Sequence, residues 1–495
     1  MQPTHIHYTP GDCALFIGPS DLLLKRLELL RVAGLRPALL CTDLPDLENL
    51  PRGLRALSGR LAGVSGWMGM FTASLQSASG PVDLAPLSFH DDGHFDWVID
   101  FSGAPAPGKG AAPLGHYALP PDDFPALKRS LLEIATRLRE GHDKPRYFQF
   151  DAEKCAHRRQ SVAGCSTCQA VCAADAIGSD GEVARIEPYL CQGCGACALV
   201  CPSGAVRHVL PGSDTQLARL GATLEPGSSG LWITDDATDA ADGWLPWPLP
   251  ETASLGLEFW LAALALGGKR VVIAAKRSSE LSHAALAGQI ELGRALLAGL
   301  GLPPALGWAE SAEALVALPP LAPFTPPVGD GKRTLLCAAL DHLAAHAPAP
   351  PVSIELPTAA PLGEVEVDAR LCTLCAACVR ICPANALSLP GSVSQLAFTE
   401  SRCLQCGLCV NVCPEKVVRL KPRYLVTKTA REAPRVIAEA EMVACAGCGM
   451  PYTTRTMLAR TQAMMAGHPM FQGEQAGLMS LCPDCRQKAM AGVPM

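Results

Sequence analysis

The stretch CTLCAACVRICPANAL, residues 372–387, spaces four cysteines as C-x2-C-x2-C-x3-C and places a proline after the fourth. The same spacing and proline recur in CLQCGLCVNVCPEKVV, residues 403–418, and in CQGCGACALVCPSGAV, residues 191–206. The chain has 495 residues and 23 cysteines. In a chain of this length, close cysteine clusters are more typical of metal binding than of disulfides.

The spacing indicates iron–sulfur clusters held by pairs of runs. A tight loop turns three thiolates toward one cubane, whereas the fourth cysteine starts a short helix and reaches the neighbouring cluster. Structural zinc is the alternative, but it favours paired Cys-x2-Cys hooks over this three-plus-one run. For the second half of the chain, the predicted ligand sets are Cys372, Cys375, Cys378 with Cys413, and Cys403, Cys406, Cys409 with Cys382.

The opening run, CAHRRQSVAGCSTCQAVCAADAI at 155–177, departs from this spacing. Val162 stands where the first cysteine is expected, and Ala173 replaces the proline. Cys155 is the nearest candidate for the missing ligand, and the alternative is a buried free thiol beside a labile three-cysteine cluster. Because only Cys155 completes eight ligands, the predicted sets are Cys155, Cys165, Cys168 with Cys201, and Cys191, Cys194, Cys197 with Cys172.

The stretched interval also contains Arg158 and Arg159. If these arginines lie near the first cluster, they stabilise its reduced state and raise its potential. If they face solvent, salt screens them and they have no such effect. The sequence leaves both alternatives open.

Both paired modules resemble bacterial two-[4Fe–4S] ferredoxin domains, on the strength of the four runs above. The resemblance implies a βαβ-βαβ fold with pseudo-two-fold symmetry, one-electron transfer and four [4Fe–4S] clusters in all. The arrangement as a whole resembles long ferredoxin-like proteins of proteobacteria that are often encoded near molybdenum-dependent formate dehydrogenases. That resemblance makes such an enzyme the expected redox partner.

The remaining segments predict a multidomain chain of α/β and α+β parts. Apolar runs such as CALFIG (13–18) and KRVVIAA (269–275) read as buried strands, and they alternate with helical periodicity. Such strand–helix–strand order favours parallel sheets. The stretch from 211 to about 365 also resembles the Rossmann-like iron–sulfur subunit found with methanogen-type hydrogenases, which implies a Rossmann-like fold there, although it lacks that family's cysteines. The loop after CALFIG has no G-x-G-x-x-G, so no dinucleotide fingerprint is present. We expect an α/β domain at 1–145, ferredoxin modules at 146–210 and 366–425, a second α/β domain at 211–365, and a metal-knuckle domain at 426–495.

Three cysteines outside the runs are expected to be structural. Cys13 and Cys41 lie in apparent strands and are predicted to be core residues. Cys337 lies on the apolar face of a predicted helix and is expected to be core rather than a ligand.

Two Cys-x2-Cys knuckles close the chain and suit one tetrahedral metal. Zinc in a ribbon-like piece is the favoured occupant, and a rubredoxin-like iron site or free thiols are the alternatives. His468 is a weaker rival ligand and is expected to be a surface residue. The predicted ligands are Cys445, Cys448, Cys482 and Cys485.

Composition narrows the possible functions. A net charge of −6 argues against a general nucleic-acid-binding protein, and no apolar segment is long enough to span a bilayer. The N-terminal sequence has no secretory signal, so the cytoplasm is the expected location. We expect a carrier of single electrons to or from a redox enzyme, rather than a free-standing enzyme. The alternatives are an electron-transfer subunit of a formate dehydrogenase-type oxidoreductase and a maturation or redox-sensing protein with structural clusters.

Overall fold

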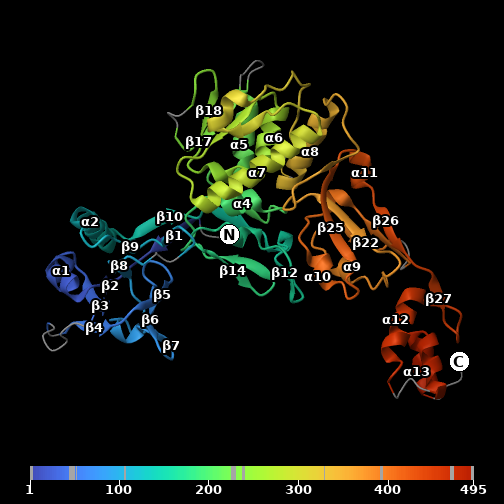
Figure 1. Ribbon diagram of the computed structural model, residues 1–495, viewed down its shortest axis with the longest axis horizontal. Coiled ribbons are helices and arrows are strands. Elements are labelled where there is room, and N and C mark those ends of the chain that lie inside the picture. The colour runs from blue at the N-terminus through green and yellow to red at the C-terminus, as the bar shows by residue number, and fades with distance from the viewer. Residues whose placement is uncertain are drawn as a thin grey trace.

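The computed structural model describes residues 4–43, 51, 53–104, 108–224, 230–236, 240–327, 329, 331–390, 394–468 and 473–491. It is a mixed α/β structure in which two small cysteine-rich modules lie among larger α/β parts (Figure 1). None of the described helices is long and apolar enough to cross a membrane.

The N-terminal part is built on a five-stranded parallel sheet in the order β4-β3-β2-β8-β9. Its apolar runs are buried on both faces, as expected for parallel strands. Cys13 and Cys41 are 0% and 1% exposed, so their prediction as core residues is confirmed. The elements are β2 (Cys13–Gly18), α1 (Ser20–Val32), β3 (Arg36–Cys41), β4 (Arg55–Ser58), β8 (Trp97–Asp100), β9 (His116–Ala118) and α2 (Phe124–Glu140).

Two antiparallel additions surround this sheet and were not expected. A three-stranded sheet comprises β5 (Leu61–Ser65), β6 (Thr72–Ser77) and β7 (Gly80–Asp83), and a strand pair comprises β1 (His5–Tyr8) and β10 (His142–Pro145).

The first cysteine-rich module follows strand–helix–strand order twice, with a hairpin inserted in the first half. Its outer strands pair antiparallel, and so do its two inner strands. The elements are β11 (Phe148–Phe150), β12 (Arg158–Arg159), β13 (Val162–Ala163), α3 (Thr167–Ala170), β14 (Ile177–Asp180), β15 (Val183–Ile186), α4 (Ala196–Val200) and β16 (Val206–His208).

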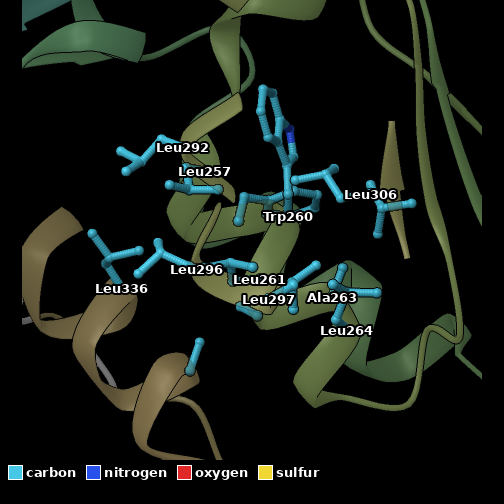
Figure 2. Close-up of a cluster of buried hydrophobic side chains, with 14 of the residues drawn as sticks. Leu257, Trp260, Leu261, Ala263, Leu264, Leu292, Leu296, Leu297, Leu306 and Leu336 are labelled. Atoms are coloured by element: carbon cyan, nitrogen blue, oxygen red, sulfur yellow. The ribbon is translucent and has the colours of Figure 1, made fainter. Parts of the chain in front are cut away.

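The central α/β part has a parallel four-stranded sheet in the order β18-β17-β19-β20. Helix α6 is buried along its whole length, and its leucines and Trp260 form a core with α7 and α8 (Figure 2). Each fully buried leucine contributes about 1.5–3 kcal/mol of transfer free energy. The elements are α5 (Ser213–Thr223), β17 (Leu231–Thr234), β18 (Leu245–Pro248), α6 (Leu257–Ala265), β19 (Val271–Ala274), α7 (Glu280–Gly299), β20 (Leu306–Trp308) and α8 (Lys332–Ala345).

The placement of Cys337 in a core is wrong. This residue lies on α8 but is only half-buried, and it lines a surface pocket with Arg333 and Asp341. The apolar face of α8 is formed by its neighbours, among them Leu336 and Leu340. Periodicity placed the residue on the helix, but at the margin of the buried stripe rather than inside it.

The second module repeats the order of the first and carries extra strands on both sheets. Its elements are β21 (Ser353–Glu355), β22 (Gly363–Val367), α9 (Ala377–Ile381), β23 (Leu387–Ser388), β24 (Gln395–Phe398), α10 (Leu408–Val412), β25 (Val418–Leu425), α11 (Lys428–Glu432) and β26 (Arg435–Glu439). The C-terminal piece follows, with β27 (Met442–Ala444), β28 (Pro451–Thr454), α12 (Arg455–Met465) and α13 (Pro483–Met490).

Candidate iron–sulfur centres

A β-hairpin occupies the long interval between Cys155 and Cys165. Strands β12 and β13 pair antiparallel. Gln160 and Ser161 form the turn with positive φ angles of 49° and 64°, and a type I′ hairpin turn requires positive φ at both central residues. The extra residues therefore form a regular element that projects from the module.

The base of the hairpin carries Cys155 back to the cysteine loop. The Cys165 N–H donates to the Ala156 carbonyl at 2.8 Å. His157 fixes the same base, because its Nδ1 lies 2.9 Å from the Cys165 carbonyl oxygen and its Nε2 lies 2.9 Å from Ser179 Oγ. Cys155 is 8% exposed and precedes Ala156 directly.

The structure brings sixteen cysteines into four groups, which we call A to D. These are the same groups of four that the spacing predicts. Group A is Cys155, Cys165, Cys168 and Cys201; group B is Cys172, Cys191, Cys194 and Cys197; group C is Cys372, Cys375, Cys378 and Cys413; group D is Cys382, Cys403, Cys406 and Cys409.

In group A, Cys168 lies among the other three thiols. Burial and then the nearby thiolates of Cys201, Cys165 and Cys155 raise the pKa of Cys168 to about 12. A set of thiols that cannot all ionise without a compensating cation is what a metal centre requires. Cys155 therefore stands where a fourth ligand would stand.

Group B contains Cys172, the fourth cysteine of the opening run, together with three cysteines of the next run. Burial, followed by Cys191, Cys194 and Cys172, raises the pKa of Cys197 well above its ordinary value. The four thiols of group B line one cavity of about 150 Å³. Three-plus-one thiolates around such a space fit a [4Fe–4S] cubane.

Group C repeats the arrangement in the second module. Burial and the thiolates of Cys372, Cys375 and Cys413 raise the pKa of Cys378 to about 12. Cys413 belongs in sequence to the neighbouring run, so the fourth cysteine is again exchanged.

Group D mirrors group B. Burial raises the pKa of Cys409, and Cys403, Cys406 and Cys382 add to the increase. Gln405 lies between two of these residues and donates its Nε2–H to Cys403 Sγ at 3.3 Å. A hydrogen bond to sulfur stabilises negative charge on a cluster and so tunes its potential.

One backbone feature repeats after every exchanged cysteine. The third residue beyond it has a positive φ in all four runs, including the run in which Ala173 replaces proline. The backbone then turns back, and the Ala176 N–H donates to Cys172 Sγ at 3.2 Å. The opening run therefore keeps the backbone turn of the other three runs, although its proline is missing. The four residues with positive φ are Asp175 (51°), Gly204 (69°), Asn385 (49°) and Lys416 (54°).

Groups A and D face each other across the two modules. Burial raises the pKa of Cys406 to about 11, and Cys165 of the other module is among the thiols that contribute. Asn411 on α10 donates its Nδ2–H to the Ala163 carbonyl at 2.8 Å. Figure 1 places the β12 hairpin beside α10. An apolar cluster seals this contact, with Ala156, Ile381, Leu404 and Leu408 all buried.

The groups therefore follow one another in the order B–A–D–C. Cys168 of group A is close enough to affect Cys197 of group B. Cys378 of group C likewise affects Cys409 of group D. The Cys165–Cys406 proximity supplies the middle step.

Two cations lie beside two of the groups, one buried and one partly exposed. Lys144 is 9% exposed and donates to the Tyr189 and Cys191 carbonyls at 2.7 and 2.8 Å. Burial lowers the pKa of Lys144 to about 8, although Cys191 opposes that shift. Arg333, near Cys403, has its pKa lowered by burial. The spacing of cysteines carries no signal for either residue.

The four C-terminal cysteines form a separate group. Their Sγ atoms all lie within 4.8 Å of one another. The N–H of Cys482 donates to Cys445 Sγ at 3.2 Å and lowers the pKa of Cys445 to about 6, with further N–H donors from the same knuckle. A thiolate at neutral pH is the form that binds metal. His468 is exposed and is not part of this group of described ligand atoms.

This C-terminal piece contacts the loop of group C. Thr454 Oγ1 donates to the Thr373 carbonyl at 3.0 Å, and Thr456 Oγ1 donates to the Cys372 carbonyl at 3.1 Å. Arg460 and Glu415 form an ion pair at 3.3 Å. The piece therefore covers the outer end of the row of groups.

Comparison with known families identifies the chemistry of part of this row. Residues 371–417, which hold groups C and D, match the 4Fe-4S dicluster domain. Residues 184–207 match the 4Fe-4S binding domain. The chain contains 4Fe–4S ferredoxin-type domains. The opening run with its displaced cysteine lies outside both matches.

One curated relative is similar over a short stretch. It is the indolepyruvate oxidoreductase subunit IorA of Pyrococcus horikoshii, 40% identical over 85 residues. The match covers 17% of this chain and 12% of the relative. Together with the family matches, it supports an iron–sulfur electron-transfer role.

Proposed function

We propose that this chain carries four [4Fe–4S] clusters in the order B–A–D–C and passes single electrons along them. The ligands are the sixteen cysteines of groups A to D. The contact between groups A and D is the observation that supports this proposal, because without it the chain would hold two unconnected two-cluster modules. The proximity of Cys165 to Cys406 makes the row continuous.

The partner is proposed to be a redox enzyme to which one end of the row delivers electrons. The relative with the 85-residue match is itself an oxidoreductase subunit. The resemblance drawn from the cysteine runs favours a molybdenum-dependent formate dehydrogenase. Stable co-purification with a catalytic subunit would support a permanently bound electron-transfer subunit. Rapid reduction and reoxidation of the isolated chain would support a freely diffusing electron carrier.

Metal and sulfide analysis of the anaerobic full chain, combined with reductive titration, tests the cluster count. We expect about sixteen iron and sixteen sulfide per chain and an uptake of about four electrons, one for each cubane. A value near eight iron contradicts the proposal. Clusters that resist reduction would favour a structural or redox-sensing role instead.

The C-terminal group is proposed to hold one zinc. Its two knuckles supply four thiolates to one centre, which suits a closed tetrahedral site. A single additional iron with no zinc would instead assign it to the rubredoxin-like alternative.

A further inference from the structure

A second kind of candidate metal site lies in the N-terminal part, far in sequence from the cysteine runs. His90, His94 and Asp96 come from the loop SFHDDGHFD, residues 88–96, which leads into β8. Their potential ligand atoms all lie within 4.8 Å of one another. His90 Nε2 is 2.7 Å from Asp96 Oδ2, and His94 Nε2 is 3.9 Å from Asp96 Oδ1.

Asp96 is held firmly by the parallel sheet. It is 2% exposed, and its Oδ2 accepts the Cys13 N–H at 2.9 Å. Gly11 lies against the same carboxylate, since a Cβ added to Gly11 would come within 2.8 Å of Asp96 Oδ2. The carboxylate is therefore fixed before any ligand binds. A buried carboxylate needs a nearby positive charge or hydrogen-bond donors.

Asp92 fixes the other side of His94. His94 Nδ1 is hydrogen-bonded to the Asp92 carboxylate, which accepts its N–H. In the neutral ring with that tautomer, the lone pair on Nε2 is free to bind a metal. An imidazole whose second nitrogen donates to a carboxylate is the usual arrangement of a metal-bound histidine. The rings of His90 and His94 are stacked with centroids 4.0 Å apart, and each offers one nitrogen within 4.8 Å of an Asp96 carboxylate oxygen.

We propose that His90, His94 and Asp96 bind a divalent ion of the zinc class. Two imidazoles and one carboxylate form a nitrogen–oxygen set that suits zinc and similar late first-row ions. The side chain of His90 is 27% exposed, whereas that of Asp96 is 2% exposed. Solvent therefore has access to the ion past His90, and water would occupy its fourth coordination position. A histidine–aspartate hydrogen-bond network without metal is the alternative, so the experiment has to separate the two.

The experiment measures zinc in the full chain with the C-terminal group disabled by Cys448→Ser and Cys482→Ser. After equilibration with Zn²⁺ and a competing chelator, we expect one zinc to remain, with nitrogen and oxygen ligands in its X-ray absorption spectrum. Adding His94→Gln or His90→Gln removes it. Asp92→Asn weakens zinc binding by about 10–100-fold, as expected for loss of the partner that orients a ligand.

His7→Gln is the matched control. His7 Nδ1 pairs with Asp143 Oδ1 at 2.6 Å on the surface, but this histidine–carboxylate pair is not part of a described three-ligand group. It should leave zinc binding unchanged. If the serine variants disturb folding, the same comparison is made in the wild-type chain, where His94→Gln should remove the nitrogen and oxygen contribution alone. Zinc content that is equal with and without His90 and His94 overturns the proposal and assigns the cluster to a proton network.

Discussion

Cys155 is the residue whose role depends most on the inserted hairpin. We predict that Cys155→Ala loses one cubane, because group A then offers three thiolates for four positions. Iron content should fall by about four atoms per chain. Electron paramagnetic resonance should show the loss in group A while groups C and D persist.

Cys337→Ala is the matched control for this variant. Cys337 is half-buried on α8 and belongs to none of groups A to D, so its removal should leave the iron content intact. A complete group A cluster in Cys155→Ala would return Cys155 to the free-thiol alternative.

Lys144 is predicted to raise the potential of group B. Reduction adds negative charge, and a buried ammonium beside Cys191 stabilises that charge. Lys144→Met should lower the potential of this cluster by an amount on the order of tens of millivolts, since about 59 mV corresponds to a tenfold change in a one-electron equilibrium. A potentiometric titration followed by electron paramagnetic resonance measures the shift.

Arg158 serves as a charge-matched control for Lys144. Arg158 is exposed and donates to the Ser161 carbonyl within its own hairpin, so solvent and salt screen it. The structure thus favours the second of the two alternatives for Arg158. Arg158→Gln should leave all four potentials unchanged, and equal shifts in both variants would mean that burial does not decide the effect.

At the scale of elements, the contact between the β12–β13 hairpin and α10 joins the modules. Gly164 ends that hairpin, and a Cβ there would lie 2.4 Å from the Ala156 carbonyl oxygen and 2.8 Å from Leu408 Cγ. Gly164→Ala should therefore push the hairpin from α10 and separate groups A and D. We expect slower electron transfer between the modules and weaker magnetic coupling, with the iron content unchanged.

Gly178→Ala offers a control in the same module. A Cβ at Gly178 would have no neighbour within 4 Å. Pulsed electron paramagnetic resonance and freeze-quench reduction of both variants make the comparison. Unchanged coupling in Gly164→Ala would mean that the hairpin does not set the distance between groups A and D.

Elements were predictable from the sequence where one short run carries the whole signal. Apolar runs such as Cys13–Gly18 predict buried strands. The spacing C-x2-C-x2-C-x3-C predicts which cysteines lie together, because the geometry of the cysteine loop is local. The hairpin was not predictable, since RRQSVA has only two residues in each strand. The bond from Asn411 to Ala163 joins residues 248 positions apart, and no spacing encodes it.

The residues of the candidate site also fall into those that the sequence predicted and those that it did not. The sequence predicted each group of four cysteines, but neither Lys144 nor Arg333 beside them. These cations come from other parts of the chain, and their effect depends on burial that only packing creates. The cluster at His90, His94 and Asp96 was present in SFHDDGHFD, but a short histidine interval without a fixed carboxylate partner is a weak signal.

On the scale of the whole molecule, the row of groups has two unlike ends. Group B borders the central α/β part through Glu251 and Arg277, which line the same cavity as its thiols. Group C is covered by the C-terminal piece, which extends away from the rest in Figure 1. A partner at the group C end therefore meets the C-terminal piece first.

The C-terminal piece is predicted to depend on its metal for folding. Its apolar core among the described residues is small: Cys445, Leu481 and Cys485 form the buried cluster, Met479 is also buried, and partly exposed side chains such as Tyr452 and Leu478 pack at its edge. Such a small core cannot offset the entropy of ordering the chain, so metal binding has to supply the stability. Cys482→Ser should remove the zinc and make residues 442–468 and 473–491 exchange amide hydrogens rapidly, while the iron content stays at about sixteen, four per cubane.

Hydrogen exchange followed by mass spectrometry, together with metal analysis, measures both effects. Loss of the contacts from Thr454 and Thr456 should also expose the loop of group C, so that cluster should be lost to oxygen before those of groups A and D. Cys337→Ser is the control for a thiol outside the site and should change neither quantity. Slow exchange at 442–468 and 473–491 in the zinc-free variant would show that packing against the second module, rather than the metal, holds the piece together.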